Sequence, residues 1–182
     1  FTSMERYFLR RATGILTVCR SLTEFAERER VQGQILQLED FPIESTHQID
    51  ESLLRQVRSE LPGKRIVYTG NLEYYQGVEL LLRSFAAVRL SDQGFEASLL
   101  IVGGKSGDVQ RLRALAKELQ VDEWVRLTGE RPGSEMGSYL AAADVLVSPR
   151  LRGSNTPLKI YSYMASGVPI VATEIESHTQ VL

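Results

Sequence analysis

The chain has 182 residues, of which 43% are apolar and 24% are charged, and its formal net charge is −2. These values are ordinary for a folded globular protein of one domain, or of one domain and part of another, and the small charge excludes a strong general attraction to nucleic acid. The single cysteine, Cys19, excludes an intrachain disulfide. The sequence also lacks an apolar run of about 18 residues, the length that would predict a membrane-spanning helix.

The first 60 residues predict two short strands with helices around them, followed by a linker and a further helix. Ser21 and Glu24 have the spacing of a capping box, which predicts that a helix begins there. Residues 39–48 contain Pro42 and few apolar side chains, so we expect a linker, and Asp50 is the expected N-cap of the helix after it. In chain order the first elements are a helix end over 3–12, a strand over 14–18, a helix over 21–31 and a strand over 35–38.

From residue 64 onward, short apolar runs alternate with helical periodicity. Ser134 is the expected cap of one short helix in this part. Because the apolar runs do not alternate with polar residues, they predict a parallel sheet covered on both faces, that is, an α/β fold of Rossmann-like type. The predicted strands are 66–69, 98–102, 124–127, 145–147 and 169–172, and the two clearest helical stripes are Val78, Leu81, Leu82 and Phe85, and Val109, Leu112, Ala116 and Leu119.

The segment 152–173 predicts a short helix with both ends specified. Thr156 is the expected N-cap and Pro157 the first helical residue, while Gly167 suits the left-handed position after the helix and Pro169 prevents its continuation. Arginines, Ser154 and Asn155 precede this helix. Free N–H groups at a helix N-terminus, beside cations, predict an anion site at the carboxyl edge of the sheet, with a diphosphate as the expected ligand.

This segment resembles the donor-binding motif of GT-B glycosyltransferases of family 4, in the variant Thr-Pro-Leu-Lys-Ile-Tyr-Ser-Tyr at 156–163. The resemblance continues upstream in the same order, with a strand, glycine-containing turn and helix over 65–85, a second strand over 99–104 and a strand over 145–149 that leads into the motif. It covers roughly residues 60–182 well and 1–45 loosely.

The resemblance implies that 46–182 form a nucleotide-sugar-binding C-terminal domain, incomplete at its C-terminus, and that 1–45 are a remnant of the N-terminal acceptor domain with its linker. It further implies a glycosyltransferase that retains anomeric configuration, uses a UDP- or GDP-linked donor and needs no metal or other cofactor. It identifies neither the acceptor nor a catalytic base, and we expect little transfer by this fragment alone. The same resemblance implies polysaccharide synthesis in the cytoplasm, and it allows peripheral association at the inner face of the membrane. It also allows oligomer formation through residues 1–45.

Donor-binding residues are carried over from the family motif position by position. Asn71 and Gln76 stand where the family usually has arginine and lysine, and Ser154 and Ser162 stand where it has glutamates. Lys159 follows the predicted N-cap, so its ammonium can lean back towards the same loop. The predicted donor-binding residues are Gly70, Asn71, Gln76, Gly77, Arg150, Arg152, Ser154, Asn155, Thr156, Pro157, Leu158, Lys159 and Ser162.

These departures leave two alternatives open. The domain could be a degenerate, non-catalytic module for nucleotide-sugar binding or assembly, or the protein could be a GT-B epimerase acting on a nucleotide sugar. Gly104-Lys105-Ser106 does not complete a P-loop because residue 99 is leucine, and no spacing of histidine, cysteine and carboxylates predicts a metal site. His178 is expected to be structural, whereas Tyr74 and Tyr75 could flank a ligand.

Overall fold

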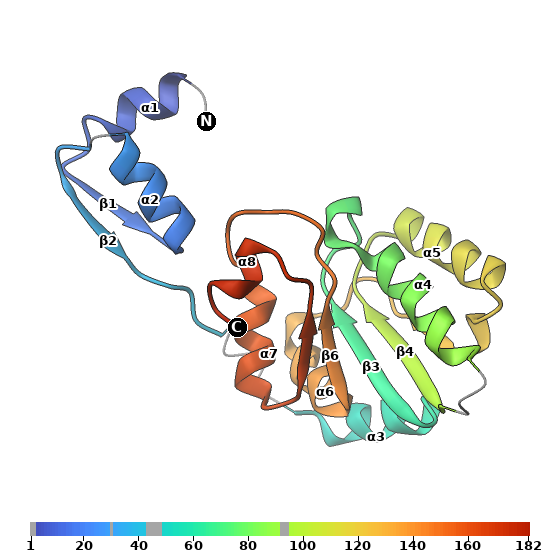
Figure 1. Ribbon diagram of the computed structural model, residues 1–182. Helices are drawn as coiled ribbons and strands as arrows, with labels where there is room; N and C mark the ends of the chain where they lie inside the picture. The colour runs from blue at the N-terminus through green and yellow to red at the C-terminus, as the bar shows by residue number, and fades with distance from the viewer. Residues whose placement is uncertain (1–2, 30, 43–48, 92–94) are drawn as a thin grey trace.

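The structure, a computed structural model, describes residues 3–29, 31–42, 49–91 and 95–182 (Figure 1). These residues form a two-stranded sheet, β1-β2, and a five-stranded sheet in the order β5-β4-β3-β6-β7. The predicted linker begins as an irregular segment after β2, and its residues 43–48 lie outside the described residues.

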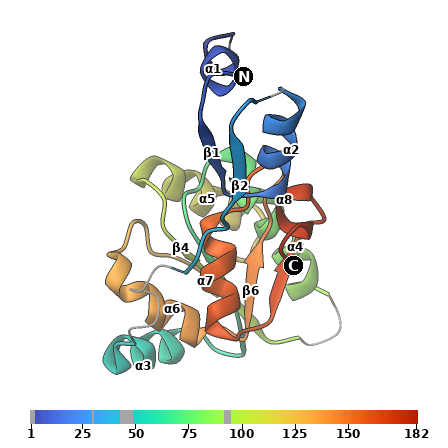
Figure 2. The same ribbon diagram turned by 90° about the vertical axis from the view of Figure 1, so that its left-hand side faces the viewer.

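The smaller sheet stands beside the larger one and is accompanied by two helices (Figure 2). Its strands are parallel, and Leu16 pairs in register with Leu36. These two side chains are 69% and 59% exposed, so the small sheet keeps apolar surface open to solvent. Its elements are α1 (Ser3–Leu9), β1 (Gly14–Thr17), α2 (Arg20–Arg28) and β2 (Gln34–Gln37).

The larger sheet is entirely parallel, which confirms the predicted α/β fold class. β3 is its central strand and pairs with both β4 and β6. The strands are β3 (Lys64–Thr69), β4 (Ala97–Val102), β5 (Val125–Leu127), β6 (Val145–Ser148) and β7 (Ile170–Ala172). The α-helices are α3 (Glu51–Glu60), α4 (Val78–Arg89), α5 (Ser106–Glu118), α6 (Met136–Ala142), α7 (Leu158–Ser166) and α8 (Glu176–Thr179), and the 3-10 turns are η2 (Tyr74–Gln76), η3 (Asp122–Trp124) and η4 (Gly133–Glu135).

Helices cover both faces of the larger sheet. Alternate residues of β4 enter two apolar clusters, because successive side chains of a strand point to opposite faces. Leu99 packs in one cluster with α4 and α5, and Leu100 packs in the other with α3, α6 and α7. Both side chains are fully buried. The predicted stripe residues of α4 all lie in the first cluster.

The predicted helix starts are partly right. Asp50 caps α3 as expected, since its carboxylate accepts the N–H groups of Ser52 at 2.8 Å and Leu53 at 3.2 Å. The capping box at Ser21 is wrong, because α2 begins at Arg20 and the Ser21 hydroxyl instead donates to the Ser154 carbonyl at 2.8 Å. Ser134 is likewise no cap: it lies inside η4, which precedes α6.

The motif helix α7 begins one residue later than the sequence predicts, at Leu158 instead of Pro157. Pro157 occupies the N-cap position, so both the cap at Thr156 and the placement of Pro157 as the first helical residue are wrong. The Thr156 hydroxyl instead accepts a hydrogen bond from the Gln180 amide at 2.9 Å. Gly167 follows α7 with φ of 70°, which confirms the predicted left-handed C-terminal residue.

Candidate functional site

Two adjoining cavities open at the carboxyl ends of the strands. We call them the α7 cavity, of about 570 Å³, and the α5 cavity, of about 490 Å³. Gly70, Asn71 and Met136 line both, so the cavities meet where β3 ends. The α7 cavity is lined by Asp40, Thr69, Gly70, Asn71, Tyr75, Gln76, Met136, Leu140, Arg150, Asn155, Thr156, Pro157, Leu158, Lys159 and Ser162. The α5 cavity is lined by Gly70, Asn71, Leu72, Glu73, Val102, Gly103, Gly104, Lys105, Asp108, Glu130, Arg131 and Met136.

The α7 cavity brings together most of the residues predicted to bind the donor. Gly77, Arg152 and Ser154 were predicted with them, but of the described residues they line neither cavity. Gly77 has φ of 70°, and a Cβ there would overlap the carbonyl of Pro149. Its glycine is therefore needed for the close approach of the loop after β3 to the loop after β6. The predicted residues on the cavity wall are Gly70, Asn71, Gln76, Arg150, Asn155, Thr156, Pro157, Leu158, Lys159 and Ser162.

Lys159, in the first turn of α7, reaches back to the end of β3. Its Nζ donates to Gln76 Oε1 at 3.2 Å and lies 4.0 Å from the centroid of the Tyr68 ring. Burial, with a smaller contribution from nearby Arg150, lowers the pKa of Lys159 to about 7. An ammonium held by an amide oxygen and a ring face lacks the charge compensation that an anion would supply.

The Arg150 guanidinium is occupied by its own loop. Its Nε donates to the Arg152 carbonyl at 2.9 Å, Nη1 donates to the Asn155 carbonyl at 2.8 Å, and Nη2 lies 3.3 Å from Asn155 Oδ1. The side chain is 8% exposed and lies 5.6 Å from the centroid of the Tyr75 ring. Arg150 therefore shapes the loop before α7 and adds positive potential to the cavity.

A buried histidine fixes the base of that loop. His178 Nε2 lies 3.0 Å from the hydroxyl of Ser148, and Nδ1 lies 2.9 Å from the Thr173 carbonyl. Burial lowers the pKa of His178, so the neutral ring donates from Nδ1–H to the carbonyl and accepts the Ser148 hydroxyl at Nε2. The Thr173 hydroxyl in turn donates to the carbonyl of Arg150. This geometry supports the structural role expected for His178.

Gln180 ties the same loop to the end of the chain described here. Its Nε2 donates to Thr156 Oγ1 at 2.9 Å and to the Ser154 carbonyl at 3.3 Å. The Ser154 carbonyl also accepts the Ser21 hydroxyl from α2. The Ser154 carbonyl therefore links its loop to α2 and to Gln180. Ser162, in contrast, is 8% exposed and lies on the α7 cavity wall.

Sequence reasoning missed several residues of the α7 cavity. Met136 and Leu140 come from α6 and supply its apolar wall, and Thr69 ends β3. Asp40 comes from the irregular segment after β2 and carried no motif that could have indicated it. Tyr75 was anticipated as a residue that could flank a ligand, and it does line this cavity.

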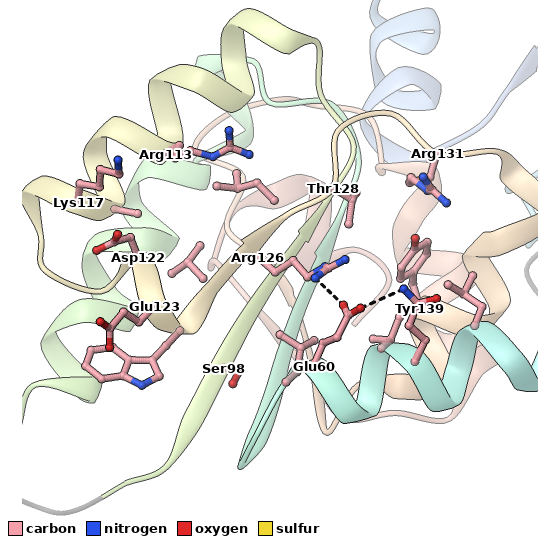
Figure 3. A pocket seen from close by; sticks show the side chains of 18 residues that line it. Glu60, Ser98, Arg113, Lys117, Asp122, Glu123, Arg126, Thr128, Arg131 and Tyr139 are labelled. Atoms are coloured by element: carbon pink, nitrogen blue, oxygen red, sulfur yellow. Dashed lines mark hydrogen bonds and ion pairs between the residues drawn. The ribbon is translucent and has the colours of Figure 1, made fainter.

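A third cavity, of about 580 Å³, follows the outer side of β5 between α3, α5 and α6 (Figure 3). In this cavity Arg126 forms an ion pair with Glu60 at 2.5 Å, and the Gln56 amide donates to the same carboxylate at 3.0 Å. Of the described residues that line it, none belongs to α7 or to the loop after β6. It is therefore separate from the predicted anion site.

The described residues contain neither a membrane-spanning helix nor a metal-binding cluster. Within these ranges, no helix is both long and apolar enough to span a membrane. The same residues contain no group of three or more histidine, cysteine, aspartate and glutamate side chains placed to hold a metal ion.

The family profile of glycosyl transferases group 1 matches residues 63–182, which include the whole larger sheet and the residues that line the two cavities, except Asp40. The chain belongs to this family. The group 1 profile thus covers the segments on which the resemblance to GT-B glycosyltransferases of family 4 was based, and it confirms that assignment.

Curated relatives are about 30% identical to this chain over the segments that align. D-inositol 3-phosphate glycosyltransferase of Corynebacterium aurimucosum is 30% identical over 133 residues, which are 71% of this chain and 31% of that enzyme. Phosphatidyl-myo-inositol mannosyltransferase of Mycobacterium leprae is 29% identical over 121 residues, which are 66% of this chain and 31% of that enzyme. The chain thus spans about a third of these relatives' length.

Several solved structures share the fold of this chain. HepE of Anabaena in complex with UDP superposes with a TM-score of 0.81 at 14% identity, over 100% of this chain and 52% of that one. The C-terminal domain of the group 1 protein LpcC of Francisella tularensis gives a TM-score of 0.59 at 16% identity, over 78% of this chain and 71% of that one. These similarities establish a GT-B type of domain.

Proposed function

We propose that the whole protein transfers a sugar from a nucleotide-sugar to an acceptor, and that residues 46–182 bind the donor. The observation that carries this proposal is the position of Lys159, whose ammonium lies between the first turn of α7 and the end of β3, at the wall of the α7 cavity. Cations and helix N-termini favour diphosphates. The adjoining α5 cavity offers space for the nucleoside, and HepE, which has the same fold, was solved with UDP and with UDP-glucose.

Residues of this chain would act on the leaving group. A preorganised ammonium and the N–H groups of a helix end stabilise the negative charge that develops on the diphosphate as the bond to the sugar breaks. The loop before α7 is held in place by Arg150 and by the Ser148–His178–Thr173 contacts, so little reorganisation is needed when the donor binds. Retention of anomeric configuration and independence from metal follow only from the family resemblance and belong to this proposal.

The remaining parts of the proposal concern the whole protein. Residues 1–45 would be the end of an acceptor-binding domain, and their exposed Leu16 and Leu36 would be covered by other parts of that domain or by another copy. Transfer would take place in the cytoplasm, with peripheral attachment at the inner face of the membrane as one arrangement. By itself the present chain would bind donor and transfer little sugar.

Isothermal titration calorimetry of the chain with UDP, GDP, UDP-glucose and GDP-mannose tests the donor site. We expect one nucleotide series to bind with one site per chain, and Lys159→Met to weaken it. Failure of every nucleotide to bind would contradict the proposal.

The second candidate, a non-catalytic binding module, is favoured by Ser154 and Ser162, which carry no charge where the family has glutamates. The backbone role of Ser154 strengthens this candidate, since its carbonyl, not its side chain, is engaged. Product analysis with the full-length protein separates the candidates: a transferase releases nucleoside diphosphate with a glycosylated acceptor, an epimerase changes the donor sugar, and a binding module leaves the donor unchanged.

A further inference from the structure

Asp40 is a carboxylate in a cavity otherwise built for an anion. It follows β2 in the irregular segment that leads towards α3, far along the chain from the motif, yet it lines the α7 cavity with Arg150 and Lys159. Among the described residues that line this cavity, Asp40 is the sole acidic side chain. It is half-buried, so any ligand that fills the cavity would meet it with limited access to water.

The position of Asp40 separates it from the nucleoside. The residues common to the two cavities, Gly70, Asn71 and Met136, mark the junction through which a nucleotide would pass. Lys159 lies beside that junction, because a Cβ at Gly70 would be only 2.8 Å from its Nζ. Asp40 lines only the α7 cavity and not the α5 cavity, as do Tyr75 and Ser162. A donor with its nucleoside in the α5 cavity and its diphosphate at Lys159 would therefore place the sugar in the part of the α7 cavity that includes Asp40.

The chemistry of a carboxylate fits a sugar and opposes a diphosphate. An ionised carboxylate only accepts hydrogen bonds, and sugar hydroxyls donate them. Such charge-assisted bonds are about twice as strong as neutral ones. Towards a diphosphate, the same carboxylate is a like charge that weakens binding. The motif serines at positions 154 and 162 cannot supply an equivalent charge.

We propose that Asp40 accepts hydrogen bonds from hydroxyl groups of the sugar carried by the nucleotide, and so contributes to the choice of donor sugar. This assignment rests on the proposed donor-binding function. It also gives the segment after β2 a direct contact with the ligand, so the ligand would touch both the linker and the domain that follows it.

The test compares nucleoside diphosphates with nucleotide-sugars in Asp40→Asn and Asp40→Ala variants. We expect removal of the charge to tighten UDP or GDP by about two- to fivefold, because a repulsion is lost. The same variants should weaken the matching nucleotide-sugar by about tenfold for asparagine and up to about a hundredfold for alanine, because hydrogen bonds to hydroxyls are lost. Calorimetry with UDP, GDP, UDP-glucose, UDP-galactose and GDP-mannose measures both quantities.

Glu39→Gln is the matched control. Glu39 precedes Asp40, is exposed and lies outside the cavity lining, so its replacement changes the net charge equally without removing a cavity group. We expect both affinities to stay within about twofold of the parent chain. Equal changes for nucleoside diphosphate and nucleotide-sugar in the Asp40 variants would overturn the assignment and leave donor binding intact. The absence of binding by any nucleotide to the parent chain would overturn the proposed function, and this inference with it.

Discussion

Two of the loops that line the α7 cavity differ in charge and in what their polar groups do. The loop after β3, from Gly70 to Gly77, carries Asn71 and Gln76 and has no lysine or arginine. The loop after β6 carries Arg150 and Arg152, but the guanidinium of Arg150 bonds to carbonyl groups of its own loop. Lys159 connects them, because it belongs to the helix after the second loop and donates to Gln76 of the first. The number of cations in a loop therefore does not predict how many of them are available to a ligand.

Replacement of Arg150 is expected to have the largest effect on the loop after β6. Arg150→Ala leaves the carbonyls of Arg152 and Asn155 without their donor, so we expect the free energy of unfolding to fall by about 1–3 kcal/mol. Nucleotide-sugar affinity should fall by about a hundredfold, because the cavity wall loses its shape. Arg152→Ala is the control, since that exposed side chain lines neither cavity. Thermal unfolding and calorimetry measure the two effects, and unchanged stability with lost binding would show that Arg150 contacts the ligand directly.

Replacement of Lys159 would test the connection itself. Lys159→Met keeps an unbranched side chain against the Tyr68 ring but removes the ammonium, so we expect folding to persist. Nucleotide-sugar affinity should decrease about 10- to 100-fold, in line with the loss of one charge-assisted contact. Calorimetry provides the measurement. An affinity equal to that of the parent chain would exclude Lys159 from the site.

The pH dependence of nucleotide-sugar binding tests whether the Lys159 ammonium contacts the ligand. The pKa of Lys159 is lowered to about 7, chiefly by burial and further by Arg150, and a bound diphosphate would favour the protonated amine. Binding would therefore take up a proton, and affinity should fall as pH rises above about 7, by no more than tenfold per pH unit. Titration of a nucleotide-sugar avoids the terminal phosphate of UDP, which itself ionises at about pH 6. In Lys159→Met this dependence of affinity on pH should vanish. If it persists in that variant, the group that takes up the proton is not Lys159.

Addition of a cation to the neutral loop gives the smallest effect. Asn71 is exposed and lines both cavities, so Asn71→Arg would place a guanidinium where the family usually has one. We expect nucleoside diphosphates to bind about three- to tenfold more tightly at low ionic strength, and less so at physiological salt. Asn71→Gln is the neutral control. Equal affinity for all three chains would show that this loop is not in contact with the phosphates.

Much of the larger sheet could be predicted from the sequence, because its strands contain short runs rich in apolar residues. The apolar stripe of α4 and the left-handed residue Gly167 were also predictable, since both depend on local geometry. The starts of α2 and α7 were not. The hydroxyls of Ser21 and Thr156 form bonds to distant residues, Ser154 and Gln180, and these tertiary contacts replaced the local caps.

The candidate site was predictable in its position but not in the role of each side chain. Strand order alone places the loops after β3 and β6 side by side at the carboxyl edge. A sequence does not reveal whether a guanidinium such as that of Arg150 faces a ligand or its own carbonyls. Asp40 reaches the cavity only because the segment after β2 folds back towards α7, which no local pattern encodes.

The central place of β3 has a consequence for synthesis of the protein. β3 is the first strand of the larger sheet to leave the ribosome, yet Ile66 and Val67 pair with Val145 and Leu146 of β6. Until β6 has emerged, one edge of the nascent β3 stays open, and the apolar surface beside it needs protection from other chains. Chaperone demand during translation is thus expected to be highest while the segment between β4 and β6 is being made.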